Sequence, residues 1–224
     1  MDYPVQAPVM HIMDGILDPY SLALWLIVAL AFIAIGVWQI GKRRVEKPAF
    51  MSILALMGAA VFVISVWHIP VAFAGSSAHP CGTALAAIVV GPFATSVVTS
   101  IALFFQMFLA HGGITTLGAN TVSLGVVGAF AGYFIYKLMR KAGASFWLAA
   151  GVGGLVGDLL TYATTALQLA LSLNPETLAA SWSFYMVGFL PTQVPLAIIE
   201  FAFTATAIQY IASHRPEILK WWQK

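Results

Sequence analysis

The chain has 224 residues, of which 61% are hydrophobic and only 8% are charged, and its mean hydropathy is +0.92. Soluble domains carry about 25% charged residues, so this composition excludes a water-soluble globular fold and indicates that a bilayer covers most of the surface. The net charge of +2 gives no reason to expect a nucleic-acid partner. Cys81 is the only cysteine, which excludes an intramolecular disulfide.

The first twenty residues do not have the pattern of an export signal. They contain three aspartates and no Lys or Arg, and they lack the basic start and the apolar core of such a signal. We therefore expect the membrane spans themselves to direct insertion.

Six stretches follow that are apolar enough to cross a bilayer, which requires roughly 20 residues in helical form. In chain order they are residues 21–41, 50–73, 83–110, 119–139, 146–173 and 183–211. We expect Pro191 and Pro195 to interrupt the last one. Only helices and closed barrels satisfy their backbone polar groups in lipid, so these long runs predict an all-α fold, a polytopic membrane helix bundle.

Basic residues between the spans form three clusters, at residues 42–47, 137–141 and 215–224. The positive-inside rule places all three clusters in the cytoplasm. The chain must then cross the membrane an even number of times between the first two clusters, and we expect four crossings, whereas a simple count gives three spans. Gly91-Pro92 resolves the conflict, because proline disfavours a continuous helix there. We predict a short helix at 83–90 and a full one at 93–110, hence seven transmembrane helices with the N-terminus outside and the C-terminus cytoplasmic.

This topology gathers histidines on the outer face. Three polar segments share that face: residues 10–15, 75–80 and 111–120. They contain His11, His79 and His111, and His68 lies near the outer end of its span, whereas His214 lies on the opposite side. Neutral imidazole is the commonest protein ligand for first-row transition metals.

Each of these residues also has a purely structural interpretation. His79 is either a loop residue bonded to a carbonyl or a metal ligand. His111 either fixes its glycine-rich loop or holds a ligand imidazole by a hydrogen bond, and Asn120 is placed to cap the following helix. His68 is interpreted as an interfacial histidine.

Met10-His11 is either an ordinary segment before a helix or a chelating group. If Met10 were the first residue, its amine, the backbone nitrogen of His11 and the His11 Nδ1 would form adjacent chelate rings. His79 would then complete a plane of four nitrogens, which suits Ni(II) and Cu(II) and accommodates Co(II).

Asp158 and Glu200 are the carboxylates that lie deep in apolar spans. They either form a proton relay, as in a secondary transporter, or are structural. We favour the structural interpretation, because no buried Lys, Arg or His accompanies them. The candidate partners are Tyr162, Thr161, Thr204 and Gln193. The chain has no phosphate-binding loop motif and no enzymatic constellation, so ATP hydrolysis is expected in partner chains.

Five motifs in order carry a resemblance to a known family: residues 10–15, 75–82, 91–92, 110–120 and 191–200. They are similar to the CbiM/NikM family, the substrate-capture (S) components of energy-coupling-factor (ECF) transporters for cobalt and nickel. The resemblance implies a seven-helix protein of the cell membrane that binds the metal through Met10, His11 and His79. Ser77, His111 and Asn120 are expected to support the site or its loops.

The resemblance also implies partners and a cargo. The expected partners are a transmembrane coupling subunit, cytoplasmic ATPase subunits and a small accessory membrane protein. The expected cargo is Co(II), taken up for cobalamin synthesis, or Ni(II), with no other cofactor and no enzymatic activity. The alternatives are a proton-coupled secondary metal transporter that uses Asp158 and Glu200, and a membrane scaffold that binds no metal.

The organisation of the chain follows from the same motifs. Residues 1–9 form an N-terminal extension that departs from the family pattern, so we expect translation to start at Met10 or the extension to be removed. Residues 10–224 form a single membrane domain. Its metal-binding segment covers residues 10–20, its helices continue to about residue 212, and a cytoplasmic tail follows.

Overall fold

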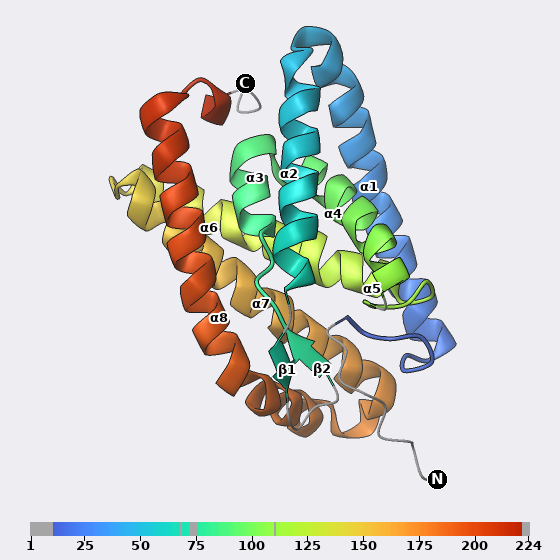
Figure 1. Ribbon diagram of the computed structural model, residues 1–224. Coiled ribbons are helices and arrows are strands. Elements are labelled where there is room, and N and C mark those ends of the chain that lie inside the picture. The colour runs from blue at the N-terminus through green and yellow to red at the C-terminus, as the bar shows by residue number, and fades with distance from the viewer. Residues whose placement is uncertain (1–10, 68, 72–75, 110, 221–224) are drawn as a thin grey trace.

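The computed structural model describes residues 11–67, 69–71, 76–109 and 111–220 (Figure 1). Within these residues, six helices are long and apolar enough to cross a membrane. They are α1 (Pro19–Glu46), α2 (Ala49–Val66), α4 (Pro92–Gln106) with the 3-10 turn Met107–Leu109, the continuous helix Leu117–Lys141, α7 (Phe146–Leu173) and α8 (Leu178–His214). The chain is a multi-pass membrane protein, as its composition predicts.

The first helix is longer at both ends than its apolar run. The Asp18 carboxylate accepts hydrogen bonds from the backbone N–H groups of Tyr20 (2.9 Å) and Ser21 (3.1 Å), so it caps the helix start. At the other end, Arg43 and Arg44 lie in the last turn, where positive charge offsets the negative end of the helix dipole. Both extensions of the helix therefore carry polar or charged side chains.

The predicted break at Gly91-Pro92 is confirmed. A short helix, α3 (Thr83–Val90), ends at Gly91, whose φ of 94° suits glycine, and α4 begins with Pro92 at its first position. All eight residues of α3 are buried. The short helix is therefore shielded by protein, as an element too short to cross a bilayer alone requires.

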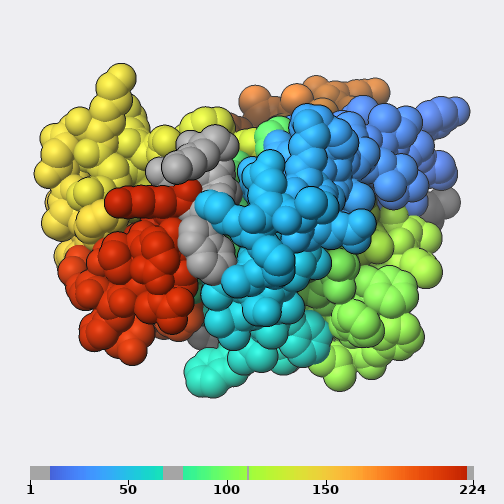
Figure 2. Space-filling model, turned by 90° about the horizontal axis from the view of Figure 1, so that it is seen from above, coloured from blue at the N-terminus to red at the C-terminus, as the bar shows by residue number. Residues whose placement is uncertain are grey.

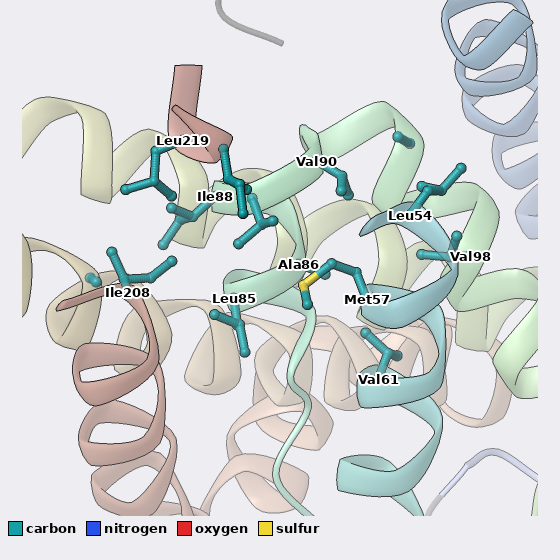
Figure 3. Packing of buried hydrophobic residues seen from close by; sticks show 14 of the residues in the cluster. Leu54, Met57, Val61, Leu85, Ala86, Ile88, Val90, Val98, Ile208 and Leu219 are labelled. Atoms are coloured by element: carbon teal, nitrogen blue, oxygen red, sulfur yellow. The ribbon is translucent and has the colours of Figure 1, made fainter. Parts of the chain in front are cut away.

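Apolar side chains of the surrounding helices pack against α3 (Figure 3). They come from α2, α4, α6 (Ala129–Lys141), α7, α8 and the 3-10 turn Ile218–Lys220. The labelled members of this cluster are Leu54, Met57, Val61, Leu85, Ala86, Ile88, Val90, Val98, Ile208 and Leu219. The main core of the protein therefore surrounds α3.

The helix Leu117–Lys141 contains α5 (Leu117–Asn120), a π-helical stretch (Thr121–Gly128) and α6 (Ala129–Lys141). It packs on α7 through glycines. A Cβ added to Gly132 would lie 2.9 Å from the carbonyl oxygen of Gly153, and one added to Gly157 would lie 2.8 Å from that of Gly128. The two backbones are therefore in contact, the close packing that small residues permit between membrane helices.

The second span is shorter than predicted. It ends at Val66, and residues predicted as helix up to 73 include strand β1 (Ile69–Val71), which pairs antiparallel with β2 (Ser76–Ala78). Ile69 lies opposite Ala78, and Val71 lies opposite Ser76. Pro70 explains the difference, because proline cannot donate in a helix interior but is tolerated at a strand edge. The all-α prediction missed this hairpin.

The last span is continuous, so the predicted interruption is wrong. Pro191 and Pro195 lie inside α8, which follows the 3-10 turn Pro175–Thr177 and curves along the side of the molecule (Figure 1). The Thr192 hydroxyl donates to the Phe189 carbonyl at 3.0 Å, one of the ways in which hydroxyl groups compensate backbone groups near a proline. The helix α8 is therefore curved but not broken at its prolines.

The basic segments gather at one end of the molecule. The α1–α2 connection, the end of α6 and the end of α8 all face the viewer in Figure 2, whereas the hairpin and the start of α1 lie toward the opposite end in Figure 1. Lys42, Arg43 and Arg44 belong to the first of these segments, and Arg140 and Lys141 to the second. The shared end agrees with the charge argument.

Candidate metal centre

Two of the predicted ligands, His11 and His79, lie side by side although they are far apart in the sequence. Their ring centroids are 5.0 Å apart, and the ring planes are inclined by 69°. His11 is 3% exposed and His79 is 1% exposed. His11 belongs to the segment before α1, and His79 directly follows β2. The fold therefore brings two buried imidazoles together at the hairpin end.

His11 is held in its neutral form. Burial lowers its pKa from 6.5 to about 4, a hydrogen bond with the side chain of Gln106 opposes this shift, and the charge of His111 adds to it. The His11 Nε2 lies 3.0 Å from Gln106 Oε1. A neutral imidazole keeps a lone pair, which is what metal ligation requires.

His79 is fixed through both its backbone and its ring. Its N–H donates to the Tyr162 hydroxyl at 3.2 Å, and that hydroxyl donates to the His79 carbonyl at 3.0 Å. The ring Nδ1 lies 2.7 Å from the carbonyl oxygen of Pro80. A carbonyl only accepts, so Nδ1 carries the hydrogen and the lone pair is on Nε2. The loop-histidine interpretation and the ligand interpretation are thus compatible.

The loop after His79 is held by the two intramembrane carboxylates. Glu200 accepts hydrogen bonds from the backbone N–H groups of Cys81 (3.1 Å) and Gly82 (3.0 Å). The Cys81 thiol donates to Asp158 at 3.2 Å. These partners differ from the side chains considered in the sequence. The carboxylates nevertheless have structural contacts, which connect α7 and α8 to the His79 loop.

Asn120 supports the segment that carries His11. Its Oδ1 accepts from the backbone N–H of Ile12 at 3.0 Å, and its Nδ2 donates to the Ile12 carbonyl at 3.1 Å. The prediction that Asn120 caps a helix is wrong, because it lies at the end of α5 and its side chain makes no capping bond. Pairing with the backbone of Ile12 uses both of its polar groups instead.

His111 and Gly112 cover the same segment. The His111 Nδ1 donates to the carbonyl of Leu109 at 2.8 Å, which ties the loop to the end of α4. Gly112 has a φ of +80°, and a Cβ there would lie 2.9 Å from the Cβ of His11. Glycine therefore lets the loop approach His11 closely. A direct role of His111 in holding a ligand imidazole remains a prediction.

Asp14 fastens the N-terminal segment to the loop before α5. Its carboxylate accepts from the backbone N–H groups of Ile114 (3.2 Å) and Thr115 (2.9 Å), and from the Thr115 hydroxyl. The Thr116 hydroxyl donates to the carbonyl of Ile12. The segment before α1 is thus fixed at Ile12 and at Asp14, close to His11.

The remaining predicted site residues are only partly placed. Met10 and His68 lie outside the described residues, and Ser77 lies in β2 opposite Pro70. Among the residues that the structure describes, no group of three or more His, Cys, Asp or Glu side chains is arranged to hold a metal ion. A metal at the two histidines would therefore need donors other than these side chains.

Two contacts at the site were missed in the sequence. Gln106, which contacts His11, is fully buried in α4, and its polarity within an otherwise apolar run was the available signal. Tyr162 was considered only as a partner of the carboxylates, whereas it binds the backbone of His79. No local pattern in the sequence indicates that a residue of α7 reaches the hairpin.

Comparison with known proteins agrees with these features. Residues 11–218 match the CbiM family, described as the cobalt uptake substrate-specific transmembrane region. The chain is 45% identical over 213 residues to the cobalt transport protein CbiM of Sorangium cellulosum, covering 94% of each chain. It is 42% identical over 211 residues to the putative cobalt transport protein CbiM of Methanocaldococcus jannaschii, covering 94% of this chain and 90% of that one.

Two solved structures share the fold. A transition metal transporter aligns with a TM-score of 0.82 and 26% identity, covering 91% of this chain and 93% of the other. A truncated transition metal transporter aligns with a TM-score of 0.80 and 27% identity, covering 92% and 99%. The family match over most of the chain and the identity to curated relatives lead to one conclusion: the chain belongs to the CbiM family of membrane components for cobalt uptake.

Proposed function

We propose that the chain captures Co(II) at the outer face of the cell membrane, as the substrate-binding subunit of an ATP-driven ECF-type uptake system. The names of its relatives favour cobalt as the cargo. Ni(II) is the second candidate, because nitrogen ligands suit both metals and the intrinsic affinity order places nickel above cobalt.

The observation that carries the proposal is the facing pair of buried imidazoles. A metal–nitrogen bond of about 2 Å places a ring centroid about 3 Å from the ion, so two rings on one ion have centroids about 4.5 Å (adjacent) to about 6 Å (opposite) apart. The 5.0 Å between the centroids of His11 and His79 lies in this range.

The remaining donors are expected from the chain immediately before His11. In a chain that begins at Met10, the terminal amine and the deprotonated backbone nitrogen of His11 complete a set of four nitrogens with the two imidazoles. Four nitrogens in a plane suit Ni(II) and accommodate Co(II). The proposed ligands are therefore Met10, His11 and His79, with Ser77, His111 and Asn120 in support.

The proposed orientation follows from charge. If the end that carries the basic segments is cytoplasmic, the histidine pair opens to the outer side, and α3 with the six long helices makes a seven-helix domain. The chain carries no phosphate-binding loop motif. A transmembrane coupling subunit and cytoplasmic ATPases, with a small accessory membrane protein, are therefore the proposed partners that drive inward release.

Calorimetric titration of the purified chain beginning at Met10 with Co(II) and with Ni(II) tests the capture step. We expect His79→Ala to abolish high-affinity binding in a protein that still elutes as a folded monodisperse species. His214→Ala is the matched control, because His214 is exposed in the last turn of α8, and it should bind as the unmodified chain does. Full affinity in His79→Ala would contradict the proposal.

Transport in liposomes separates this proposal from a proton-coupled carrier. The purified chain alone should show no uptake driven by a pH gradient, and uptake should require the coupling subunit, the ATPases and ATP. Uptake by the chain alone that is lost in Asp158→Asn or Glu200→Gln would favour the carrier. The contacts of Glu200 argue against it, since both carboxylate oxygens accept backbone hydrogen bonds.

A further inference from the structure

Gln106, the last residue of α4, joins three separate parts of the chain. It is fully buried, and its amide contacts the end of α2 as well as His11 in the segment before α1. A buried glutamine in an apolar helix is costly unless each polar group has a partner. The arrangement of those partners decides which way the amide faces.

The amide nitrogen of Gln106 faces α2. Its Nε2 lies 3.1 Å from the carbonyl oxygen of Phe62 and 2.6 Å from the hydroxyl of Ser65. The Phe62 carbonyl only accepts, and the Ser65 hydroxyl donates its own hydrogen to the carbonyl of Val61. A flipped amide would place its oxygen against these acceptors. The hydrogen-bond network therefore assigns the nitrogen to this side.

The amide oxygen of Gln106 consequently faces His11. Oε1 lies 3.0 Å from the His11 Nε2 and only accepts, so Nε2 must carry the ring hydrogen. In a neutral imidazole, the lone pair is then on Nδ1. The contact thus defines both the tautomer and the orientation of the His11 ring.

We infer that Gln106 is a positioning residue that holds the His11 ring with Nδ1 available for the metal. The inference rests on the proposed function. Only Nδ1 is near enough to its own backbone nitrogen to close a six-membered chelate ring with a shared ion, through Cα, Cβ and Cγ. Nε2 lies on the far side of the ring and cannot. Accepting the Nε2 hydrogen also makes the ligand nitrogen more basic.

Two substitutions separate this role from simple packing. Gln106→Met keeps a similar length and removes the acceptor, whereas Gln106→Glu keeps an oxygen for the Nε2 hydrogen and, when protonated, a donor for the Phe62 carbonyl. Loss of such an outer partner lowers metal affinity by about 10- to 100-fold. We expect this loss of Co(II) affinity in Gln106→Met and a clearly smaller one in Gln106→Glu. Gln209→Met is the control. Gln209 is exposed near the C-terminal end of α8, so this variant should bind Co(II) normally.

The metal-free protein gives a readout that packing alone would not move. In nitrogen-15 NMR of the histidine-labelled protein in micelles, His11 should show a hydrogen on Nε2 and a lone pair on Nδ1 in the unmodified chain and in Gln106→Glu. In Gln106→Met, both tautomers should be populated. The His11 signals are assigned by their loss in His11→Asn.

The outcomes are distinct. A hydrogen on Nδ1 of His11 in the unmodified chain would overturn the inference, and so would a Gln106→Met protein with unchanged spectrum and affinity. If Gln106→Met does not fold, Ser65→Ala provides a second test. It removes one of the two acceptors for the amide nitrogen of Gln106, and it should still shift the tautomer populations of His11. Failure of the unmodified chain to bind Co(II), with the Nε2 hydrogen in place, would overturn the proposed function instead.

Discussion

The hydroxyl of Tyr162 both accepts a hydrogen bond from the backbone N–H of His79, at 3.2 Å, and donates one to the carbonyl of the same residue, at 3.0 Å. One side chain of α7 thereby satisfies both polar backbone groups of a buried residue. It also fixes the position of the imidazole without using either ring nitrogen. The proposed ligand is thus held in place before any metal arrives.

Removing this hydroxyl should weaken both the fold and the site. Tyr162→Phe leaves two buried backbone groups without their partner, and each such group costs about 1–3 kcal/mol. We expect a lower free energy of unfolding in detergent and a lower affinity for Co(II). Tyr210→Phe, an exposed tyrosine of α8, serves as the control, and equal effects of the two substitutions would show that the Tyr162 contact is unimportant.

Glu200 should matter for binding even where no proton gradient exists. It holds the backbone of Cys81 and Gly82, just after His79. In Glu200→Gln, only one side-chain oxygen remains to accept, and the amide group faces a backbone N–H that it cannot accept from. We expect weaker Co(II) binding in detergent, measured by calorimetry. Normal binding combined with lost uptake in liposomes would instead indicate a proton-transfer role.

The contact between α6 and α7 should tolerate no side chain. In Gly132→Ala, the new Cβ would lie 2.5 Å from the Cβ of Ala84 and 2.9 Å from the Gly153 carbonyl. Overpacking of this kind typically costs about 1–3 kcal/mol. Gly41→Ala is the matched control, because a Cβ at Gly41 of α1 meets nothing within 4 Å. Alanine favours a helix over glycine by up to about 1 kcal/mol, so thermal unfolding should separate the two variants in opposite directions.

Much of the helical framework could be predicted, because bilayer thickness and backbone satisfaction constrain it strongly. The bounds of α7, Phe146–Leu173, agree with the apolar run, and Gly91-Pro92 indicated the break before α4. The hairpin and the continuity of α8 could not be predicted in this way. Pro70 is a local signal against helix but does not indicate which strand pairs with it, whereas α8 stays continuous through Pro191 and Pro195 against the local proline signal.

The site could be predicted only in part, for a related reason. His11 and His79 carry a recognisable chemical signal, because imidazole is a common metal ligand. Their supports do not, since Asn120 and Glu200 act on backbone groups of distant residues. A side chain that recognises backbone leaves no pattern in the sequence of its partner. These contacts become visible only when the folded chain brings the segments together.

Stability of the metal-free protein should decrease in acid through His11. Its pKa of about 4 in the folded state lies below the value of about 6.5 for an exposed histidine. The unfolded chain therefore binds the proton more tightly than the folded chain does. The contribution of His11 to the free energy of unfolding is greatest above pH 6.5 and is lost as the pH falls toward 4. At pH 4.5, the loss is about 2–3 kcal/mol. His11→Gln should lack this part of the pH dependence of unfolding in detergent, and an identical pH profile would contradict the assignment.

The start of the chain decides how many nitrogens the site can offer. In a chain that begins at Met10, the amine is a donor, whereas in a chain that retains residues 1–9 the same nitrogen belongs to a peptide bond and must lose its hydrogen before it can bind a metal. We therefore expect the Met10 chain to bind Ni(II) in a square-planar, diamagnetic form with the visible absorption of four nitrogen ligands. The Met1 chain should lose that absorption and most of the affinity. A Met10 chain whose amine is acetylated is the sharpest control, because it removes the amine as a donor without changing the position of any residue. Equal affinity and equal spectra for all three chains would show that the amine is not a ligand, and the two imidazoles would then need other partners.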